Sequence, residues 1–338
     1  MRFRTTTLRN MDLERKETRV VHASTANSTR ISAGIGPRVR AHVSLTKPRI
    51  IELLLVTAVP TMFLAAEGLP TWQVTIAVLV GGAFAAGAAN TFNSLYDRDI
   101  DAVMERTTHR PAVMGDVSIR AGFIQGLVLS ALSITVLTVL ANPLSALLAL
   151  IAIVGYAVGY TMLLKRRTDQ NIVWGGAAGC MPVLIAWAAV TGTLSLAPVV
   201  LFMIVFWWTP PHYWPLAIKY REDYRAAGVP MLPVVKPPRS VARHIVAYSW
   251  LMVLTSLALL FVAPVGWVYG IGAGLVGVAF LVQSYRLWSS IRRDSKGADA
   301  AGDFYSAGTL RVSMQLFHGS ITYLAIIFLL VGLSPFVY

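Results

Sequence analysis

Nine stretches of about 20 mostly apolar residues constrain the fold of this chain more than any other feature. A helix of that length crosses the ~30 Å hydrocarbon core of a bilayer. The stretches are continuously apolar, without the alternation of a membrane barrel, so we predict an all-α polytopic membrane protein. They lie at roughly residues 50–67, 73–96, 119–140, 143–163, 172–191, 198–218, 243–263, 267–288 and 315–336.

The composition agrees with a membrane protein, because 56% of the 338 residues are hydrophobic and 13% are charged, which excludes a soluble globular domain. Basic loops stay on the cytoplasmic side of a membrane. With nine spans, the basic residues predict a cytoplasmic N-terminus and a C-terminus outside. The 29 Lys and Arg residues all fall in alternate connections, 11 in residues 1–49, 4 in 98–120, 3 in 165–167, 6 in 219–243 and 5 in 286–311.

The net charge of +13 follows from this orientation and from contact with the anionic headgroups of the lipid bilayer. We therefore expect no nucleic-acid partner. Residues 1–43 are polar and basic and predict a disordered cytoplasmic tail, whereas 44–338 form the membrane domain. A mitochondrial transit peptide is the alternative for the tail, although its acids Asp12, Glu14 and Glu17 argue against it.

The segment NSLYDRDIDAVMERTTHRP, residues 93–111, carries the strongest functional signal. Asn93, Asp97 and Asp101 recur every four residues, so they share one face of a helix, while Asp99 points away. Like charges at this spacing repel each other, but a divalent cation bound between the carboxylates would offset the repulsion. Mg²⁺ is usually held by one or two carboxylates together with phosphate oxygens. The segment thus predicts a Mg²⁺-diphosphate site, with a merely solvated helix end as the alternative.

Two further groups of charges accompany this segment. Arg106 and Arg110 follow it, and guanidinium forks match phosphate oxygens. At the end of the sixth apolar stretch and beyond it the chain reads PPHYWPLAIKYREDYRAAGVPMLP, where Lys219 precedes Asp223 by four residues. Asp223 lies ten residues before a proline, as Asp101 does in the first loop, which hints at an internal repeat with two acidic ends across one cavity.

These motifs together resemble the UbiA-type intramembrane prenyltransferases and, within them, the haem O synthase branch. The first signature is NxxxDxxxD followed by ERTTHRP. The branch is indicated by KPRIIELLLVTAVPTMFLAA, LKRRTDQNIVWGGAAGCMPVLIAW, PPHYWPLAIKYREDYRAAGVPMLP and the final SITYLAIIFL. The resemblance runs from about residue 44 to the C-terminus. It implies nine transmembrane helices around a central cavity open to the cytoplasmic side of a bacterial plasma membrane.

The resemblance also implies an activity. It is the transfer of a farnesyl group from farnesyl diphosphate to a vinyl group of haem B with Mg²⁺ as cofactor, giving haem O and diphosphate. Haem A synthase enters as a candidate partner. In this interpretation the catalytic residues are Asn93, Asp97, Asp101 and Asp223, of which the first three hold the metal. The diphosphate-binding residues are then Arg106, Arg110, Lys165, Arg166 and Lys219.

Two polar residues within the apolar stretches have alternative interpretations. Glu52 is an acid inside the first apolar stretch, and it either contributes to the site or pairs with Lys47 or Arg49. His212 either contacts haem or caps a helix broken by prolines.

Two other functions stay open at this point. One is a UbiA-type enzyme with a quinone-precursor or other aromatic acceptor. The other is a transporter or haem carrier, against which the acids argue because they cluster at one membrane face.

Overall fold

The structure is a computed structural model that describes residues 35–297 and 305–337, except the side chains of residue 50 and of residues 52–54 and 295–297. The described residues form helices and connections with no strand, which confirms the all-α prediction. Most of the predicted tail falls on residues 1–34, outside the described part. The chain divides into a unit that ends at Ala41 and a second unit that begins at His42. Helix α2 (Ile35–Leu45) contains the described residues of the first unit.

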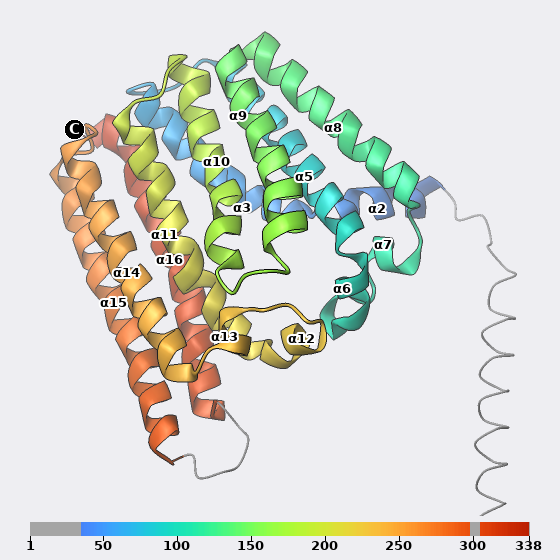
Figure 1. Cartoon of the computed structure of the whole chain (residues 1–338). Helices are drawn as coiled ribbons and strands as arrows, with labels where there is room; N and C mark the ends of the chain where they lie inside the picture. Colours follow the sequence, from blue (N-terminus) through green and yellow to red (C-terminus); the bar gives the residue numbers. More distant parts are fainter. Residues whose placement is uncertain (1–34, 298–304, 338) are drawn as a thin grey trace, which may run out of the picture. The chain divides into compact units, whose positions relative to one another are not determined.

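Long helices dominate the second unit (Figure 1). Two of them contain π-helical segments, one between α4 and α5 (Ala77–Gly81) and one that continues α9 (Gly155–Leu164). The long helices are α3 (Pro48–Ala65), α4 (Trp72–Ile76) with α5 (Gly82–Tyr96), α8 (Ile119–Leu140), α9 (Pro143–Val154), α10 (Asn171–Thr191), α11 (Leu196–Lys219), α14 (Pro238–Ala258), α15 (Gly266–Gly297) and α16 (Ala307–Val337).

Eight helices within the described residues are long and apolar enough to cross a membrane. They coincide with the second to ninth predicted stretches. Helix α3 occupies the first predicted stretch, and within it Leu55–Ala65 forms a shorter apolar helix. The chain is therefore a multi-pass membrane protein, while the ninth crossing stays a prediction.

Helices α10 and α11 form the interior of the second unit. In the most apolar 18 residues of each helix, 61% of the residues of α10 and 56% of those of α11 are buried, against 17% in α8. Leu201 and Ile204 of α11 belong to the main core cluster with Phe328 of α16. Helix α8 instead exposes a face of large apolar side chains, which in a membrane would contact lipid.

Glycine allows α5 and α8 to approach closely. A Cβ atom at Gly126 of α8 would lie 2.6 Å from the Phe92 ring of α5, and one at Gly122 would lie 2.7 Å from the Leu95 side chain. Small residues at helix contacts are typical of membrane proteins, because packing drives association there. These contacts fix the position of α5, whose last turn carries Asn93 and leads directly into Asp97 and α6.

Four short helices lie at one end of the second unit, two from each of two loops. They are α6 (Arg98–Val103), α7 (Pro111–Met114), α12 (Arg221–Ala226) and α13 (Leu232–Val235). Figure 1 shows all four at the same end. Apolar residues of the two loops form a small core there together with Ile172 of α10 and Ala217 of α11. In each loop the first helix has six residues and the second has four. The acid of the repeated acid-to-proline spacing lies in the first helix and the proline lies in the second.

Candidate active site

We call the shared face of Asn93, Asp97 and Asp101 the carboxylate stripe. It lies along the end of α5 and the start of α6. Asn93, Asp97 and Asp101 are 4%, 1% and 3% exposed. The Asp99 side chain, which the helical period turns away from the stripe, is 65% exposed. Two acids are therefore buried on one face of one helical segment, where a charge is costly unless a partner meets it.

Asp97 is the most enclosed of these acids. Its Oδ2 accepts a hydrogen bond from Nδ2 of Asn93 at 2.6 Å and forms an ion pair with Nζ of Lys165. Its Oδ1 lies 3.7 Å from Nη2 of Arg166 and has no hydrogen-bond partner among the described residues. A buried carboxylate oxygen without a donor is a position where a cation could bind.

Asp101 meets a different cation. Its Oδ2 accepts a hydrogen bond from Nη1 of Arg110 at 2.6 Å. The hydroxyl of Thr107 donates to the backbone carbonyl of Asp101 at 2.8 Å, which folds the loop back over the stripe. Arg110 stays one third exposed, so its guanidinium can also reach a ligand.

Lys47 adds a cation from a segment far away in the sequence. Its Nζ donates to Oδ1 of Asn93 at 2.5 Å. The residue has φ 54°, a left-handed conformation that is uncommon for a side chain other than glycine. Burial, followed by the charges of Arg110 and Lys165, lowers the pKa of Lys47 to about 7. A lysine placed among cations in this way favours the binding of an anion.

The π-helical continuation of α9 supplies the opposite side of the stripe. Oγ1 of Thr161 accepts a hydrogen bond from Nδ2 of Asn93 at 3.2 Å, and Lys165 follows at the end of the segment. Arg166 binds the Asp99 carboxylate with both terminal nitrogens at 2.7 Å, and these hydrogen bonds lower the pKa of Asp99 to about 2. π-helical segments are frequent at functional sites.

Arg106 joins the first loop to the second. Its Nη2 donates to the hydroxyl of Tyr224 at 2.8 Å, and its guanidinium lies 5.1 Å from the centroid of the Tyr220 ring. Asp223 is near enough to act on the charge of Arg106, whereas Nζ of Lys219 lies 5.4 Å from the Tyr220 ring. The two loops thus meet through Arg106, beside the predicted second acid.

The two residues with alternative interpretations have different outcomes. His212 of α11 is buried between Trp208 and Phe317, with ring centroids 4.1 and 4.7 Å away. Its Nδ1 is 2.8 Å from Oγ of Ser320, so the ring packs α11 against α16. A haem contact stays a prediction. The side chain of Glu52 lies outside the described part of the structure, so its role stays a prediction too.

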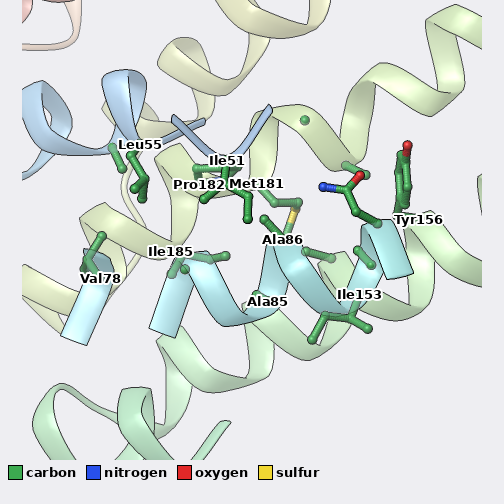
Figure 2. Close-up of a pocket in the computed structure, with 17 residues that line it drawn as sticks. Ile51, Leu55, Val78, Ala85, Ala86, Ile153, Tyr156, Met181, Pro182 and Ile185 are labelled. Atoms are coloured by element: carbon green, nitrogen blue, oxygen red, sulfur yellow. The ribbon is translucent and has the colours of Figure 1, made fainter. Parts of the chain in front are cut away.

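An apolar pocket opens beside the stripe. Its side chains surround about 760 Å³ of space, which includes open solvent at the mouth. Asn90, one helical turn before Asn93, is among its lining residues, and Figure 2 shows Tyr156 beside the apolar side chains. The other lining residues come from α3, from α5 with the π-helical turn before it, and from α9 and α10, among them Leu55, Val78, Ile153, Met181 and Ile185.

The pocket and the stripe are connected through one hydrogen-bonded chain. The hydroxyl of Thr161 donates to the carbonyl of Tyr156 at 2.8 Å while it accepts from Asn93. A ligand with a charged head and an apolar tail would therefore find both surfaces within adjoining turns of α5 and α9. This arrangement suits an isoprenoid diphosphate better than a wholly polar molecule.

The stripe also fits a divalent metal ion. Its donors are carboxylate and amide oxygens, which Mg²⁺ prefers. The described residues contain no group of three His, Cys, Asp or Glu that could hold a metal by themselves. Asn93, Asp97 and Asp101 would thus supply part of the shell, and phosphate oxygens and water would supply the rest.

Sequence reasoning missed Lys47, Thr161 and Tyr156 as parts of the site. Lys47 precedes α3 by one residue and touches a side chain 46 positions away, so no local pattern indicates the contact. The signal that was available for the other two is GYAVGYT at residues 155–161, which places polar groups four and five residues apart at the end of an apolar stretch.

Known sequences resemble this chain along most of its length. The sequence model of the UbiA prenyltransferase family matches residues 54–307. The chain is 53% identical over 309 residues to a protein of Kineococcus radiotolerans, covering 89% of each chain. It is 50% identical to one of Paenarthrobacter aurescens, covering 92% of this chain and 94% of the relative. Both relatives are named protoheme IX farnesyltransferase.

Solved structures share the fold at low sequence identity. A UbiA homolog from Archaeoglobus fulgidus bound to DMAPP and Mg²⁺ has a TM-score of 0.61 and 19% identity, covering 86% of this chain and 98% of that one. The structure of a digeranylgeranylglyceryl phosphate synthase has a TM-score of 0.68 and 13% identity, covering 88% and 98%. At these identities the likeness establishes the fold alone.

Proposed function

This chain belongs to the UbiA prenyltransferase family, and from that premise we propose that it is a protohaem IX farnesyltransferase. It transfers the farnesyl group of farnesyl diphosphate to a vinyl group of haem B and produces haem O and diphosphate. The observation that most supports this activity is the buried stripe of Asn93, Asp97 and Asp101 beside an apolar pocket. The acceptor follows from the relatives at about half identity, which are named for protohaem. No observation favours a quinone-precursor acceptor.

The diphosphate head binds where cations surround the stripe. Lys47, Arg110, Lys165 and Arg166 contact Asn93, Asp101, Asp97 and Asp99, respectively, and Arg106 lies at the junction of the loops. Arg110 and Lys165 hold Asp101 and Asp97 in ion pairs, and each can contact a phosphate oxygen with its remaining hydrogens. Mg²⁺ bound by Asn93, Asp97 and Asp101 would supply Lewis-acid stabilisation of the departing diphosphate.

The reaction begins when the C–O bond between farnesyl and diphosphate breaks. The bonding electrons leave with the diphosphate, whose growing charge meets the fixed cations. The allylic cation that remains is next to the ring of Tyr156, and the apolar pocket keeps water away from it. The vinyl π electrons of haem B then form the new C–C bond. Water adds to the resulting porphyrin-side cation and loses a proton, which leaves the hydroxyethylfarnesyl group.

The proposal also covers the second loop, the membrane and a partner enzyme. Asp223 with Lys219 forms the wall across from the stripe, and Arg106 connects it to the first loop. We place the protein in the plasma membrane of a bacterial cell with the site facing the cytoplasm, since the basic loops gather on that side. Haem A synthase stays the candidate partner because it would consume the product.

The test is a pigment extraction. Membranes that contain the protein are incubated with haem B, farnesyl diphosphate and Mg²⁺, and the haems are analysed by mass spectrometry. We expect a haem that has gained one farnesyl group and one water, and loss of that product when EDTA removes the metal. Modification of a quinone precursor with haem left unchanged would refute the proposal.

A further inference from the structure

Five exposed arginines gather at the ends of α14 and α15 on the side of the molecule that carries the basic loops. None of them forms an ion pair with a carboxylate whose side chain the structure describes. We call this group the arginine patch. It consists of Arg239 and Arg243 of α14 and Arg286, Arg292 and Arg293 of α15.

Two of these arginines lie near the N-terminus of α14, where a positive charge is unfavourable for the helix. Arg239 lies in the first turn of α14, where the helix dipole is positive, and Arg243 lies one turn further along the same helix. The first turn contains no acidic residue, and Pro237 at the N-cap provides no side-chain hydrogen bond. Cations at this end destabilise a helix, so an anion bound there would offset their effect.

The patch borders two adjoining hollows of different character. Arg239, Arg243 and Arg292 line the first hollow together with Trp288. Arg286 and Arg293 line the second, which continues along α15 as an apolar groove. The apolar lining residues of the groove are Val278, Leu281 and Val282 of α15 and Val312 of α16.

Aromatic rings connect the two hollows. Tyr285 lines the groove and Trp288 the first hollow, and their ring centroids are 5.5 Å apart. Nε1 of Trp250 donates to the hydroxyl of Tyr285 at 3.2 Å. Tyr and Trp are enriched where a membrane protein passes from hydrocarbon to headgroups. The rings therefore indicate that the arginines lie at headgroup level and the groove lies deeper.

We propose that the arginine patch binds the headgroup phosphate of an anionic phospholipid, with an acyl chain of that lipid in the groove along α15. Guanidinium forks match phosphate oxygens, and basic pockets between transmembrane helices are suited to such headgroups. An acidic protein partner would use the arginines but would leave the apolar groove without a role. The site shares no residue with the carboxylate stripe, so it does not depend on the proposed function.

Native mass spectrometry of the purified full chain tests this proposal. The protein is released from micelles that contain equal amounts of phosphatidylglycerol and phosphatidylcholine, and retained lipids are counted. We expect preferential retention of phosphatidylglycerol. Arg243→Gln/Arg292→Gln should weaken it about 30-fold, because each basic residue near an anionic surface is worth a factor of about five. Arg38→Gln/Arg120→Gln removes the same charge from exposed positions elsewhere and should retain the lipid.

A second pair of variants separates binding from folding. Arg243→Lys/Arg292→Lys keeps the charge but loses the forks, so we expect retention between that of the wild type and the glutamine variant. Thermal unfolding in lipid-free detergent should be alike for all variants. Equal lipid loss in the glutamine variant and the control pair, equal retention of both lipids by the wild type, or displacement of the lipid by millimolar inorganic phosphate would overturn the assignment.

Discussion

Replacing Asp97 by Asn gives the sharpest test of the carboxylate stripe, because Asp99 offers the same substitution two residues away. Asp97 is buried and its Oδ1 has no hydrogen-bond partner among the described residues. Asp99 is exposed and is paired with Arg166. Asp97→Asn removes a charge from the proposed metal site, whereas Asp99→Asn removes one from the surface.

The expected magnitudes differ for activity and for stability. In Asp97→Asn the amide oxygen can still accept from Asn93 and Lys165, but the NH₂ group replaces Oδ1 and faces Arg166. Losing one preorganised electrostatic group costs about 10²–10³ in kcat. The free energy of unfolding should fall by about 1–3 kcal/mol, less than the ~3–5 of a fully buried pair, since Lys165 and Arg166 keep some exposure. Asp99→Asn should change stability by at most about 1 kcal/mol.

The assay measures haem O formation at saturating Mg²⁺ and farnesyl diphosphate, together with thermal unfolding of each variant in detergent. We expect Asp99→Asn to stay within about threefold of the wild type while Asp97→Asn loses at least about a hundredfold. A folded Asp97→Asn protein as active as Asp99→Asn would refute the metal role of the stripe.

Three further substitutions test the pocket, the anion site and the scaffold. Tyr156→Leu should lower kcat about tenfold, while Tyr156→Phe stays near wild type because the ring provides the cation–π contact; equal losses would contradict this. The KM for farnesyl diphosphate should rise as pH increases above about 7, because the charged form of Lys47 binds the anion, and Lys47→Arg should flatten this rise. Gly126→Ala forces a Cβ against Phe92 and should cost about 1–3 kcal/mol in detergent unfolding, whereas Gly274→Ala, with open space, should be neutral.

The all-α architecture follows from the sequence because lipid leaves few alternatives. Every backbone polar group must be satisfied within the membrane, so length and hydropathy suffice to place the helices. The stripe is predictable for a related reason, since the helical period places Asn93, Asp97 and Asp101 on one face, which is buried, and turns Asp99 to the exposed side.

The partners of the stripe could not be predicted in the same way. Arg110 and Lys165 were expected to bind phosphate, and the structure pairs them with Asp101 and Asp97. Their role toward phosphate stays a prediction. The pairing depends on how α5, the end of α9 and the loop after α6 come together, which is a tertiary arrangement. The left-handed backbone of Lys47 likewise depends on the approach of α3 to α5.

The ion pairs at the stripe explain how two acids can be buried in a membrane protein before any metal is considered. Each carboxylate faces its own cation, which offsets much of its desolvation. Lys47 is different, because it contacts an amide oxygen, and burial together with the neighbouring cations lowers its pKa. An arriving diphosphate would therefore gain most from Lys47 and need not break the pairs of Asp97 and Asp101. Because Lys47 contributes mainly to binding of the diphosphate, Lys47→Gln should raise the KM for farnesyl diphosphate more than it lowers kcat. Asp97→Asn should do the reverse and lower kcat more than it raises KM.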